Sequence, residues 1–448
     1  MTVLSRSITP LHATALVVGI IIGASIFVQP SVITGTVPTL GAVYAVWIVS
    51  GILTLFGALI AAELASAYPR SGGVYVFLRE SWGSSVAFLW GWAMFWTMHT
   101  GIIAVIASVF ARYAAFFVDA GPAGTKVIAI AAVLVLSGVN YVGVRQGSLV
   151  QTTTAIAKVG AIVAIILVAF ALGRQRPVQP SVGFPDVVPA GELTARTFAL
   201  ALVAGLFAFG GWHMVTYSAE ETRQPERTIP RALAIGVALV TACYVLLNAA
   251  YFHVLTPSEI ARSTRVAADA ADAVLGRGGA AITSAIVAVS TFGALNGVIL
   301  AGPRVYLEMA RDGLLVRWAA AVHERFQTPH RAIALQAIWA SVLVATGSYR
   351  ALFTRVVYTE WIFFALMAIG LMRLRRRAEY APAYRVWGYP LVPIVFAVSS
   401  LYIVANQVIS EPKESLIGLL FVVIGLPIFW WTSRYSTQVV FERTAKSE

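Results

Sequence analysis

Two stretches of the chain combine small residues with apolar ones in a way that would free backbone hydrogen-bonding groups. The first, residues 19–30, places Gly23, Ala24 and Ser25 near the middle of an apolar run. A helix that breaks at small residues leaves N–H and C=O groups unpaired, which is costly in a bilayer unless protein or a cavity surrounds them. The freed N–H groups at the positive end of the next half-helix would attract an anionic group.

The second stretch, residues 206–213, has a pair of glycines, Gly210 and Gly211, at its centre. Each stretch opens a block of five apolar runs, and the two stretches would cross the membrane in opposite directions. Corresponding interrupted helices in two halves of a chain are typical of inverted-repeat transporters, whose site lies between the two breaks. The pattern therefore predicts one site shared by both stretches.

Lys158 is the ionisable residue whose position says most about the chemistry. It lies in the apolar run 151–172, roughly 10 Å deep at a rise of about 1.5 Å per residue. Such a lysine must be paired, deprotonated or extended back toward the membrane surface. Ser290 and Thr291 in a later run could help to coordinate sodium, although hydroxyls in membrane helices more often bond to their own helix.

Other polar residues in or beside the apolar runs each allow two interpretations. Glu63 could carry protons, but its place at the end of a run fits a structural ion pair better. His99 and His213 could contact a ligand in a cavity, or could pack between helices as hydrogen-bonded histidines. Asn296 is expected to bond between helices near the site, and Trp212 adjoins the second break.

The composition is that of a polytopic membrane protein. Hydrophobic residues make up 59% of the 448 residues and charged residues 12%, compared with about 25% charged residues in soluble domains. About 20 apolar residues are needed to cross a bilayer. The chain contains twelve predicted spans, at about 12–35, 40–66, 84–117, 126–142, 151–172, 196–219, 231–254, 278–302, 331–348, 356–373, 388–408 and 415–433.

The distribution of positive charge predicts the orientation of these spans. Most of the 32 Lys and Arg residues fall on the side of the membrane that holds the N-terminus. The positive-inside rule therefore places both termini in the cytoplasm, in a multi-pass protein of the plasma membrane. The net charge of +12, densest at residues 373–377, is explained by this bias and by anionic lipid, so nucleic-acid binding is not expected.

Six motifs in this chain resemble those of the amino acid-polyamine-organocation (APC) superfamily, and within it the L-type amino-acid transporter branch. They lie at residues 23–30, 69–73, 207–212 with Glu220 and Glu221, 292–297, 310–314, and 384–385 with 388–390. The resemblance implies an all-α integral membrane protein with a LeuT-type 5+5 inverted repeat, 12 transmembrane helices, and breaks in helices 1 and 6. It implies one transporter domain, 1–448, with a first repeat at about 12–172, an inverted second repeat at about 196–373, and helices 11 and 12 at about 388–433.

The resemblance also implies the site residues. The carboxylate of an α-amino acid would bind N–H groups around Gly23, Ala24 and Ser25, and the α-ammonium group would bind carbonyls freed at the two breaks. Phe207 would be the gate over the site, and Lys158 would place its amine where sodium would otherwise sit. The full predicted set is Ile22, Gly23, Ala24, Ser25, Ile26, Phe207, Ala208, Gly210, Trp212, His213 and Asn296 for the substrate, with Lys158 for coupling. The family usually has glycine in place of Ser25, and often has Asn or Asp in place of His213.

The expected function is secondary active transport of an α-amino acid by alternating access, without sodium, as proton symport or as amino-acid exchange. A small or medium neutral substrate is favoured because no acidic or arginine side chain is expected in the cavity. The alternatives are sodium-coupled transport, transport of polyamines or cationic amino acids, a channel, and a non-transporting amino-acid sensor. No catalytic triad order, metal-ligand cluster or phosphate-binding loop stands in a suitable context, so no enzyme activity, metal or cofactor is expected.

The cysteine content bears on protein partners. Animal L-type relatives are disulfide-linked to a single-span glycoprotein through a cysteine between spans three and four. Here that loop, residues 119–126, has no cysteine, and the one cysteine of the chain, Cys243, lies within span seven. The expected partners are therefore an amino-acid substrate, the lipid bilayer and, for symport, protons, without a disulfide-linked glycoprotein subunit.

Overall fold

The computed structural model describes residues 4–118, 120–173, 193–276, 278–347 and 356–432, and every regular element in these ranges is a helix. The first part contains α1 (Pro10–Ile21), the 3-10 turn η1 (Ser25–Phe27), α2 (Gln29–Thr34), α3 (Leu40–Ala67), α4 (Val74–Trp82), α5 (Ser84–Ala93), the π-helical turn η2 (Met94–Met98), α6 (His99–Ala114), α7 (Gly121–Val142) and α8 (Val144–Leu172). The second part contains α9 (Ala195–Ala208), the 3-10 segment η3 (Trp212–Glu221), α10 (Pro225–Val254), α11 (Pro257–Arg262), α12 (Val266–Leu275), α13 (Gly279–Ala301), α14 (Pro303–Arg311), η4 (Arg317–Ala320), α15 (His330–Thr346), α17 (Thr359–Leu374), α18 (Leu391–Ser410) and α19 (Pro412–Val423).

The helices are those of a multi-pass membrane protein. Within the described ranges, nine helical segments are long and apolar enough to cross a bilayer. They are Leu40–Ala67, Ser84–Ala114, Gly121–Val142, Val144–Leu172, Ala195–Glu221, Pro225–Val254, Ala281–Arg311, Leu391–Ser410 and Pro412–Thr432. The other three predicted runs coincide with shorter elements, namely α1 together with α2, α15, and α17.

The outer helices present apolar side chains to the surroundings. On α8, Leu149, Ile156 and Leu167 are each more than 60% exposed. Their spacing of seven and eleven residues puts them on one face of the helix. Such a face suits contact with lipid acyl chains, since no water is present at that depth.

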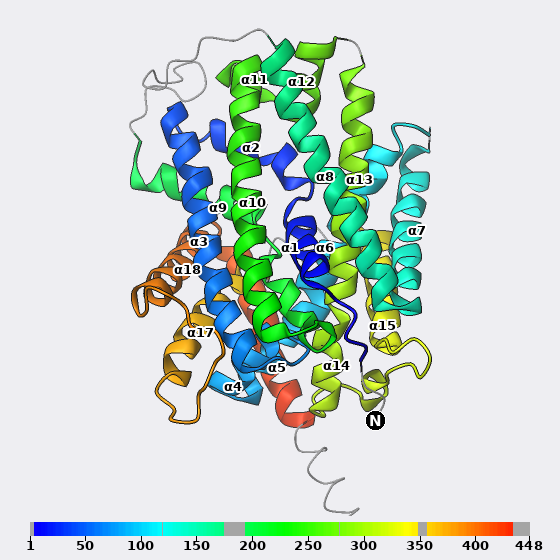
Figure 1. Ribbon diagram of the computed structural model, residues 1–448, viewed down its shortest axis with the longest axis vertical. Coiled ribbons are helices and arrows are strands. Elements are labelled where there is room, and N and C mark those ends of the chain that lie inside the picture. The colour runs from blue at the N-terminus through cyan, green and yellow to red at the C-terminus, as the bar shows by residue number, and fades with distance from the viewer. Residues whose placement is uncertain (1–3, 119, 174–192, 277, 348–355, 433–448) are drawn as a thin grey trace, which may run out of the picture.

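The short helix α1 lies in the middle of the molecule and packs against α8, α10 and α13 (Figure 1). Its first turn is stabilised by Pro10 and by the Thr9 side chain, which accepts a hydrogen bond of 3.3 Å from the His12 N–H. The contact with α10 is close, because a Cβ atom at Gly236 would lie 2.6 Å from Val17. The interrupted helix is therefore held on several sides by continuous ones.

Figure 1 shows the N-terminal end and the end of α19 at the same end of the molecule, called here the terminal end. There the segment before α1 pairs with the end of η3. The Ile8 N–H donates to the Glu221 carbonyl and the Arg223 N–H donates to the Ile8 carbonyl, each at 2.9 Å. These bonds tie the two interrupted helices to each other at the terminal end.

Candidate functional site

The first predicted break is present between α1 and η1. Helix α1 ends at Ile21, and the chain bends through residues 22–24 before η1 and α2 resume. Within the described part of the chain, the N–H groups of Ala24, Ser25 and Ile26 donate no hydrogen bond, whereas the Gly23 N–H donates to Ile21 at 2.8 Å. Three backbone donors thus remain at the positive end of the η1–α2 segment, where an acceptor is strongly favoured.

Lys158 stabilises the other side of this break. Its Nζ atom donates to the Gly19 carbonyl at 2.5 Å and to the Ile22 carbonyl at 2.8 Å, and its side chain is buried. A cation at the C-terminal end of α1 complements the helix dipole and satisfies carbonyls that lost their helical partners. Ser290 also donates to the Ile22 carbonyl, at 3.3 Å, while the Thr291 hydroxyl bonds back to its own helix. Lys158 is therefore paired with the first break and does not extend toward the membrane surface.

The second predicted break is present between α9 and η3. Helix α9 ends at Ala208, and Phe209, Gly210 and Gly211 form a turn before η3. Gly211 has φ = +89°, and a Cβ atom there would lie 2.4 Å from the Ile20 side chain. Glycine is required at this position by both the backbone conformation and the close approach of the two broken helices.

Tyr244 joins the two breaks, although the sequence analysis did not select it. Its hydroxyl lies 3.0 Å from the Ile21 carbonyl and 3.1 Å from the Ala208 carbonyl, so one donor is shared between the last turns of α1 and α9. The ring packs edge-on against Trp47, with centroids 5.4 Å apart, and against Phe209 at 5.0 Å. Tyr244 lies in the predicted apolar run 231–254. Because a hydroxyl at that depth must find a hydrogen-bond acceptor, its position in the run was the feature of the sequence that pointed to such a role.

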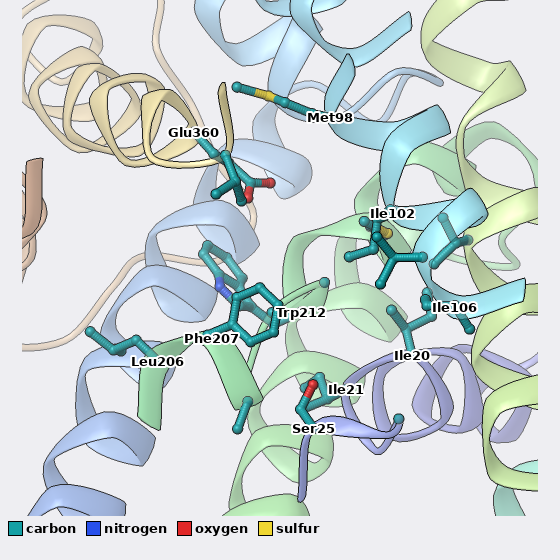
Figure 2. A pocket seen from close by; sticks show the side chains of 18 of the residues that line it. Ile20, Ile21, Ser25, Met98, Ile102, Ile106, Leu206, Phe207, Trp212 and Glu360 are labelled. Atoms are coloured by element: carbon teal, nitrogen blue, oxygen red, sulfur yellow. The ribbon is translucent and has the colours of Figure 1, made fainter. Parts of the chain in front are cut away.

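A cavity of about 350 Å³ lies beside the two breaks (Figure 2). It is bounded by the first break, α6, the second break and the first turn of α17. Of the predicted substrate residues, those that line the cavity are Gly23, Ala24, Ser25, Phe207, Ala208, Gly210 and Trp212, and those that do not are Ile22, Ile26, His213 and Asn296. Phe207 is 40% exposed, whereas Trp212 is buried.

Asn296 and His99 both make hydrogen bonds between helices. Asn296 is fully buried and its Nδ2 atom donates to the Gly147 carbonyl at 2.9 Å, so the predicted interhelical bonding is confirmed. His99 lines the cavity, and its Nε2 atom bonds to the Val298 carbonyl at 2.8 Å. Both therefore hold α13 against neighbouring helices.

Glu360 is a charged cavity residue that the sequence analysis did not select. It lies in the first turn of α17 and lines the cavity. The expectation that the cavity holds no acidic side chain is therefore wrong, and with it the argument for a neutral substrate loses its basis. Glu360 stands near the start of the predicted run 356–373, and the sequence does not show what that end of the run faces. Only the packing of α17 places that end against the second break.

His213 lies behind this carboxylate. It is buried against Trp212 and Phe364, with ring centroids 5.4 and 5.0 Å away. Its Nε2 atom is 3.5 Å from the Glu360 carboxylate, and within the part of the chain that the structure describes neither ring nitrogen makes a hydrogen bond. A buried polar side chain without a hydrogen-bond partner is uncommon in native structures.

At the terminal end, charged side chains form a set of ion pairs. The deepest pair joins Arg304 at the start of α14 to Glu221 at the end of η3, by two hydrogen bonds of 2.7 and 2.8 Å. Both side chains are fully buried. A buried pair with this bidentate geometry is strongly destabilised when one partner is removed.

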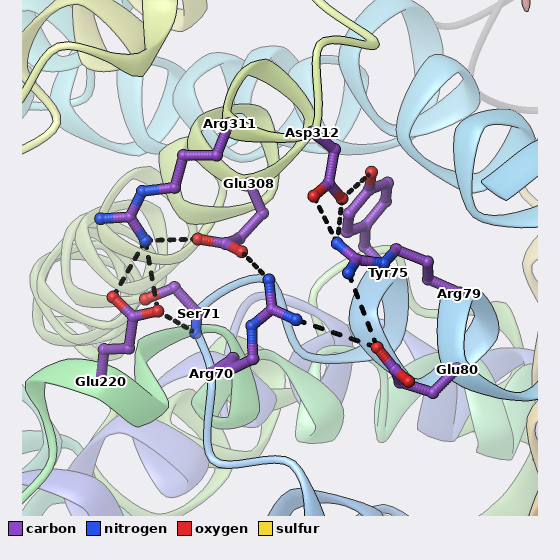
Figure 3. Close-up of polar contacts among 9 residues, drawn as sticks. All are labelled: Arg70, Ser71, Tyr75, Arg79, Glu80, Glu220, Glu308, Arg311 and Asp312. Atoms are coloured by element: carbon purple, nitrogen blue, oxygen red, sulfur yellow. Dashed lines mark hydrogen bonds and ion pairs between the residues drawn. The ribbon is translucent and has the colours of Figure 1, made fainter. Parts of the chain in front are cut away.

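A second cluster surrounds the loop 69–73 (Figure 3). Arg70 pairs with Glu308 at 3.1 Å, and Arg311 lies between Glu308 and Glu220 at 2.5 and 3.1 Å. The Ser71 N–H also donates to Glu220 at 3.3 Å. The cluster therefore connects the loop after α3, the end of η3 and α14.

Neighbouring hydrogen bonds and ion pairs extend this cluster. Tyr75 donates to Asp312 at 2.7 Å, and Arg79 also pairs with Asp312. Burial and the Asp312 carboxylate raise the pKa of Tyr75, so it remains a neutral donor. Glu63 is fully buried and accepts from Arg375 at 2.8 Å, which confirms the predicted structural ion pair.

Nothing in the described ranges resembles a metal centre, since no group of three or more His, Cys, Asp or Glu side chains is arranged to hold an ion.

Comparison with known proteins shows which proteins this chain resembles. A family model described as amino acid permease matches residues 8–431. The chain is 32% identical to the b(0,+)-type amino acid transporter 1 of Mus musculus, over 98% of this chain and 92% of that protein.

Two further relatives match over nearly the same length. One is the serine/threonine exchanger SteT of Bacillus subtilis, 31% identical over 95% of this chain and 97% of that protein. The other is the cystine/glutamate transporter of Homo sapiens, 30% identical over 95% of this chain and 85% of that protein. Each of the three similarities covers at least 95% of this chain.

Proposed function

Because the chain belongs to the amino acid permease family, it is a transporter of amino acids, and we propose that it carries an α-amino acid across the plasma membrane by alternating access. The observation that carries this proposal is the pair of interrupted helices beside one cavity. Free backbone donors stand on the cavity side of one break, and helix C-terminal carbonyls stand at both. This arrangement suits a zwitterion.

The substrate carboxylate binds the N–H groups of Ala24, Ser25 and Ile26. The α-ammonium group binds the carbonyl ends of α1 and α9, at Ile21, Ile22 and the residues 207–210. Tyr244 and Lys158 already donate to some of these oxygens, but each carbonyl has two lone pairs and accepts a second bond. Phe207, partly exposed at the cavity wall, closes over the bound substrate.

Transport is independent of sodium, and amino-acid exchange is the form that the name of one relative favours. The Lys158 ammonium group lies between the first break and α13, where it takes the place of a cation bound in each cycle. The bacterial relative is named an exchanger. A fixed positive charge at this point suits exchange, whereas a lysine that releases its proton in each cycle would give proton symport.

We assign the chain twelve transmembrane helices in a LeuT-type arrangement with inverted repeats at about 12–172 and 196–373. The broken helix of α1 and α2, together with α15 and α17, adds three spans to the nine candidate spans in the described ranges, which gives twelve. The terminal end is the cytoplasmic end, as the positive charge of the sequence favours. The ion pairs around Arg304 and Arg311 then form a closed inner gate, and the cavity faces outward.

Uptake of radiolabelled L-amino acids into sodium-free proteoliposomes tests this proposal. Unlabelled amino acid inside the vesicles should accelerate uptake, and an inside-alkaline gradient should not. Lys158→Ala should lower uptake about tenfold or more, because two carbonyls at the first break lose their donor. Lys126→Ala is the matched control, since Lys126 also donates to a carbonyl, at 3.0 Å, but at an exposed position.

The outcomes separate the alternatives. Uptake that follows the proton gradient and is lost in Lys158→Ala would replace exchange by proton symport. Uptake that requires sodium would contradict the role given to Lys158. If no amino acid is taken up under any of these conditions, the proposal of transport at this site fails.

A further inference from the structure

The cavity beside the two breaks has apolar walls and one carboxylate. Its lining on α6 and η2 includes Met94, Met98, Ile102 and Ile106. Among the described lining residues, Glu360 is the only Asp, Glu, Lys or Arg. An ionised carboxylate in such surroundings is costly unless a positive group or several donors accompany it.

The protein itself supplies little to offset this cost. In the described ranges, no side chain donates a hydrogen bond to the Glu360 carboxylate, and no Lys or Arg lies within 4.0 Å of it. His213 lies 3.5 Å from it, and within the described ranges both ring nitrogens of His213 lack hydrogen bonds. Tyr358 in the preceding turn donates instead to the Ser415 carbonyl. The partly buried acid and the buried histidine therefore form a polar pair that makes no hydrogen bond to the described side chains.

The position of the Glu360 carboxylate in the cavity suits contact with the side chain of a bound amino acid. Figure 2 shows Ser25 and Glu360 on opposite sides of the cavity, with Phe207 and Trp212 between them along one wall. A substrate whose α-carboxylate binds at the first break would extend its side chain across the cavity toward Glu360. Aromatic rings of Trp212, Trp361 and Phe364 also line the cavity, and such rings attract cations through their faces.

We propose that Glu360, backed by His213, is the subsite for a positively charged side-chain end, so that the transporter accepts α-amino acids with a terminal amine or guanidinium group. The inference rests on the proposed function, because it assumes that the α-carboxylate binds at the first break. A cationic group would pair with a carboxylate that has no Lys or Arg partner among the described residues. An uncharged polar side chain of the same length binds at this subsite more weakly.

The test compares arginine with citrulline, which has nearly the same shape but no charge. Exchange in proteoliposomes and ligand-induced stabilisation of the detergent-purified protein are measured for both amino acids. Wild type should prefer arginine. Glu360→Gln should lower arginine uptake about 10- to 100-fold, the range expected for loss of a charge-assisted hydrogen bond, and should leave citrulline uptake within about twofold.

Glu411→Gln is the matched control, because it removes the same charge at an exposed position before α19, outside the cavity lining. It should leave the arginine-to-citrulline ratio unchanged. Retained citrulline uptake in Glu360→Gln also shows that this variant is folded. A variant that loses both amino acids is replaced by Glu360→Asp, which keeps the charge and should restore arginine uptake above that of citrulline.

Two results would overturn the subsite without touching the proposed function. One is a wild-type protein that transports neutral amino acids but neither binds nor transports arginine. The other is an arginine-to-citrulline ratio that Glu360→Gln leaves unchanged. Absence of uptake and of stabilisation with every amino acid would instead reject the proposed function itself.

Discussion

At the scale of single residues, the backbone groups on the two sides of the first break differ in whether they have hydrogen-bond partners. The carbonyls of Gly19 and Ile22 accept hydrogen bonds from the Lys158 ammonium group, whereas the N–H groups of Ala24 to Ile26 donate to no acceptor in the described chain. A buried charge is stabilised here by the dipole and carbonyls of α1 rather than by a carboxylate. The described chain thus supplies a donor to two acceptors of the break and leaves three of its donors without an acceptor.

Gly23→Ala tests whether these donors bind the substrate. A Cβ atom at Gly23 would meet no atom closer than 3.8 Å, so the fold should tolerate the change, with a melting temperature within about 2 °C of wild type. A methyl group beside the donors should nevertheless obstruct a carboxylate and raise the KM for uptake about tenfold. Thermal unfolding and uptake kinetics measure the two effects. An unchanged KM would place the carboxylate elsewhere.

At the scale of elements, the two breaks are coupled because the last turn of one broken helix lies close to the turn of the other. Gly211 lies against Ile20 of α1, and the Tyr244 hydroxyl is shared by the last turns of α1 and α9. A shift of one half-helix must therefore change the contacts of the other. The segment around Ile8 adds a third connection at the terminal end. Movement of the two broken helices as one unit is the simplest consequence.

Gly211→Ala should disrupt this coupling. A residue with Cβ pays about 1–2 kcal/mol for a left-handed backbone conformation, and here its Cβ would also lie 2.4 Å from Ile20. The expected result is a lower melting temperature and loss of uptake. Gly160→Ala in α8 is the control, since no atom lies within 4 Å of its Cβ and alanine favours a helix. Equal behaviour of the two variants would contradict the required glycine.

At the scale of the whole molecule, ion pairs gather at the terminal end and a cavity lies beside the two breaks. Ion pairs of Arg304, Arg311 and Arg70 join the loop 69–73, η3 and α14 at the terminal end. The members of these pairs come from both halves of the chain. The proposed alternating access would require these pairs to break when the terminal end opens.

Arg311→Gln should favour the state that is open at the terminal end, because Glu220 and Glu308 lose the cation between them. Cys243→Ser provides a background without cysteine, and Ser71→Cys then reports opening at a residue that is fully buried in this state. Maleimide labelling at that position should become several-fold faster. Arg265→Gln is the control, since its pair with Asp269 is exposed and lies at the opposite end. Unchanged labelling would exclude the cluster as a gate.

Much of the architecture could be predicted from the sequence because it depends on local composition. Apolar runs of sufficient length become membrane helices, and small residues at 23–25 and 210–211 interrupt two of them, in both cases where the structure has a break. The burial of Lys158 within span five also follows from its depth, and its need for a partner follows from its charge. The family motifs made the class of function recognisable.

The tertiary structure alone decided which polar groups meet. Tyr244 reaches the ends of two different helices, and Arg304 finds Glu221 from 83 residues away. Glu360 lies at the start of a helix in the sequence, yet the packing of α17 turns it toward the cavity and toward His213. Local sequence sets whether a residue is buried, but a hydrogen bond or ion pair depends on the direction of both side chains. That direction is set by the packing of helices that are distant in the chain.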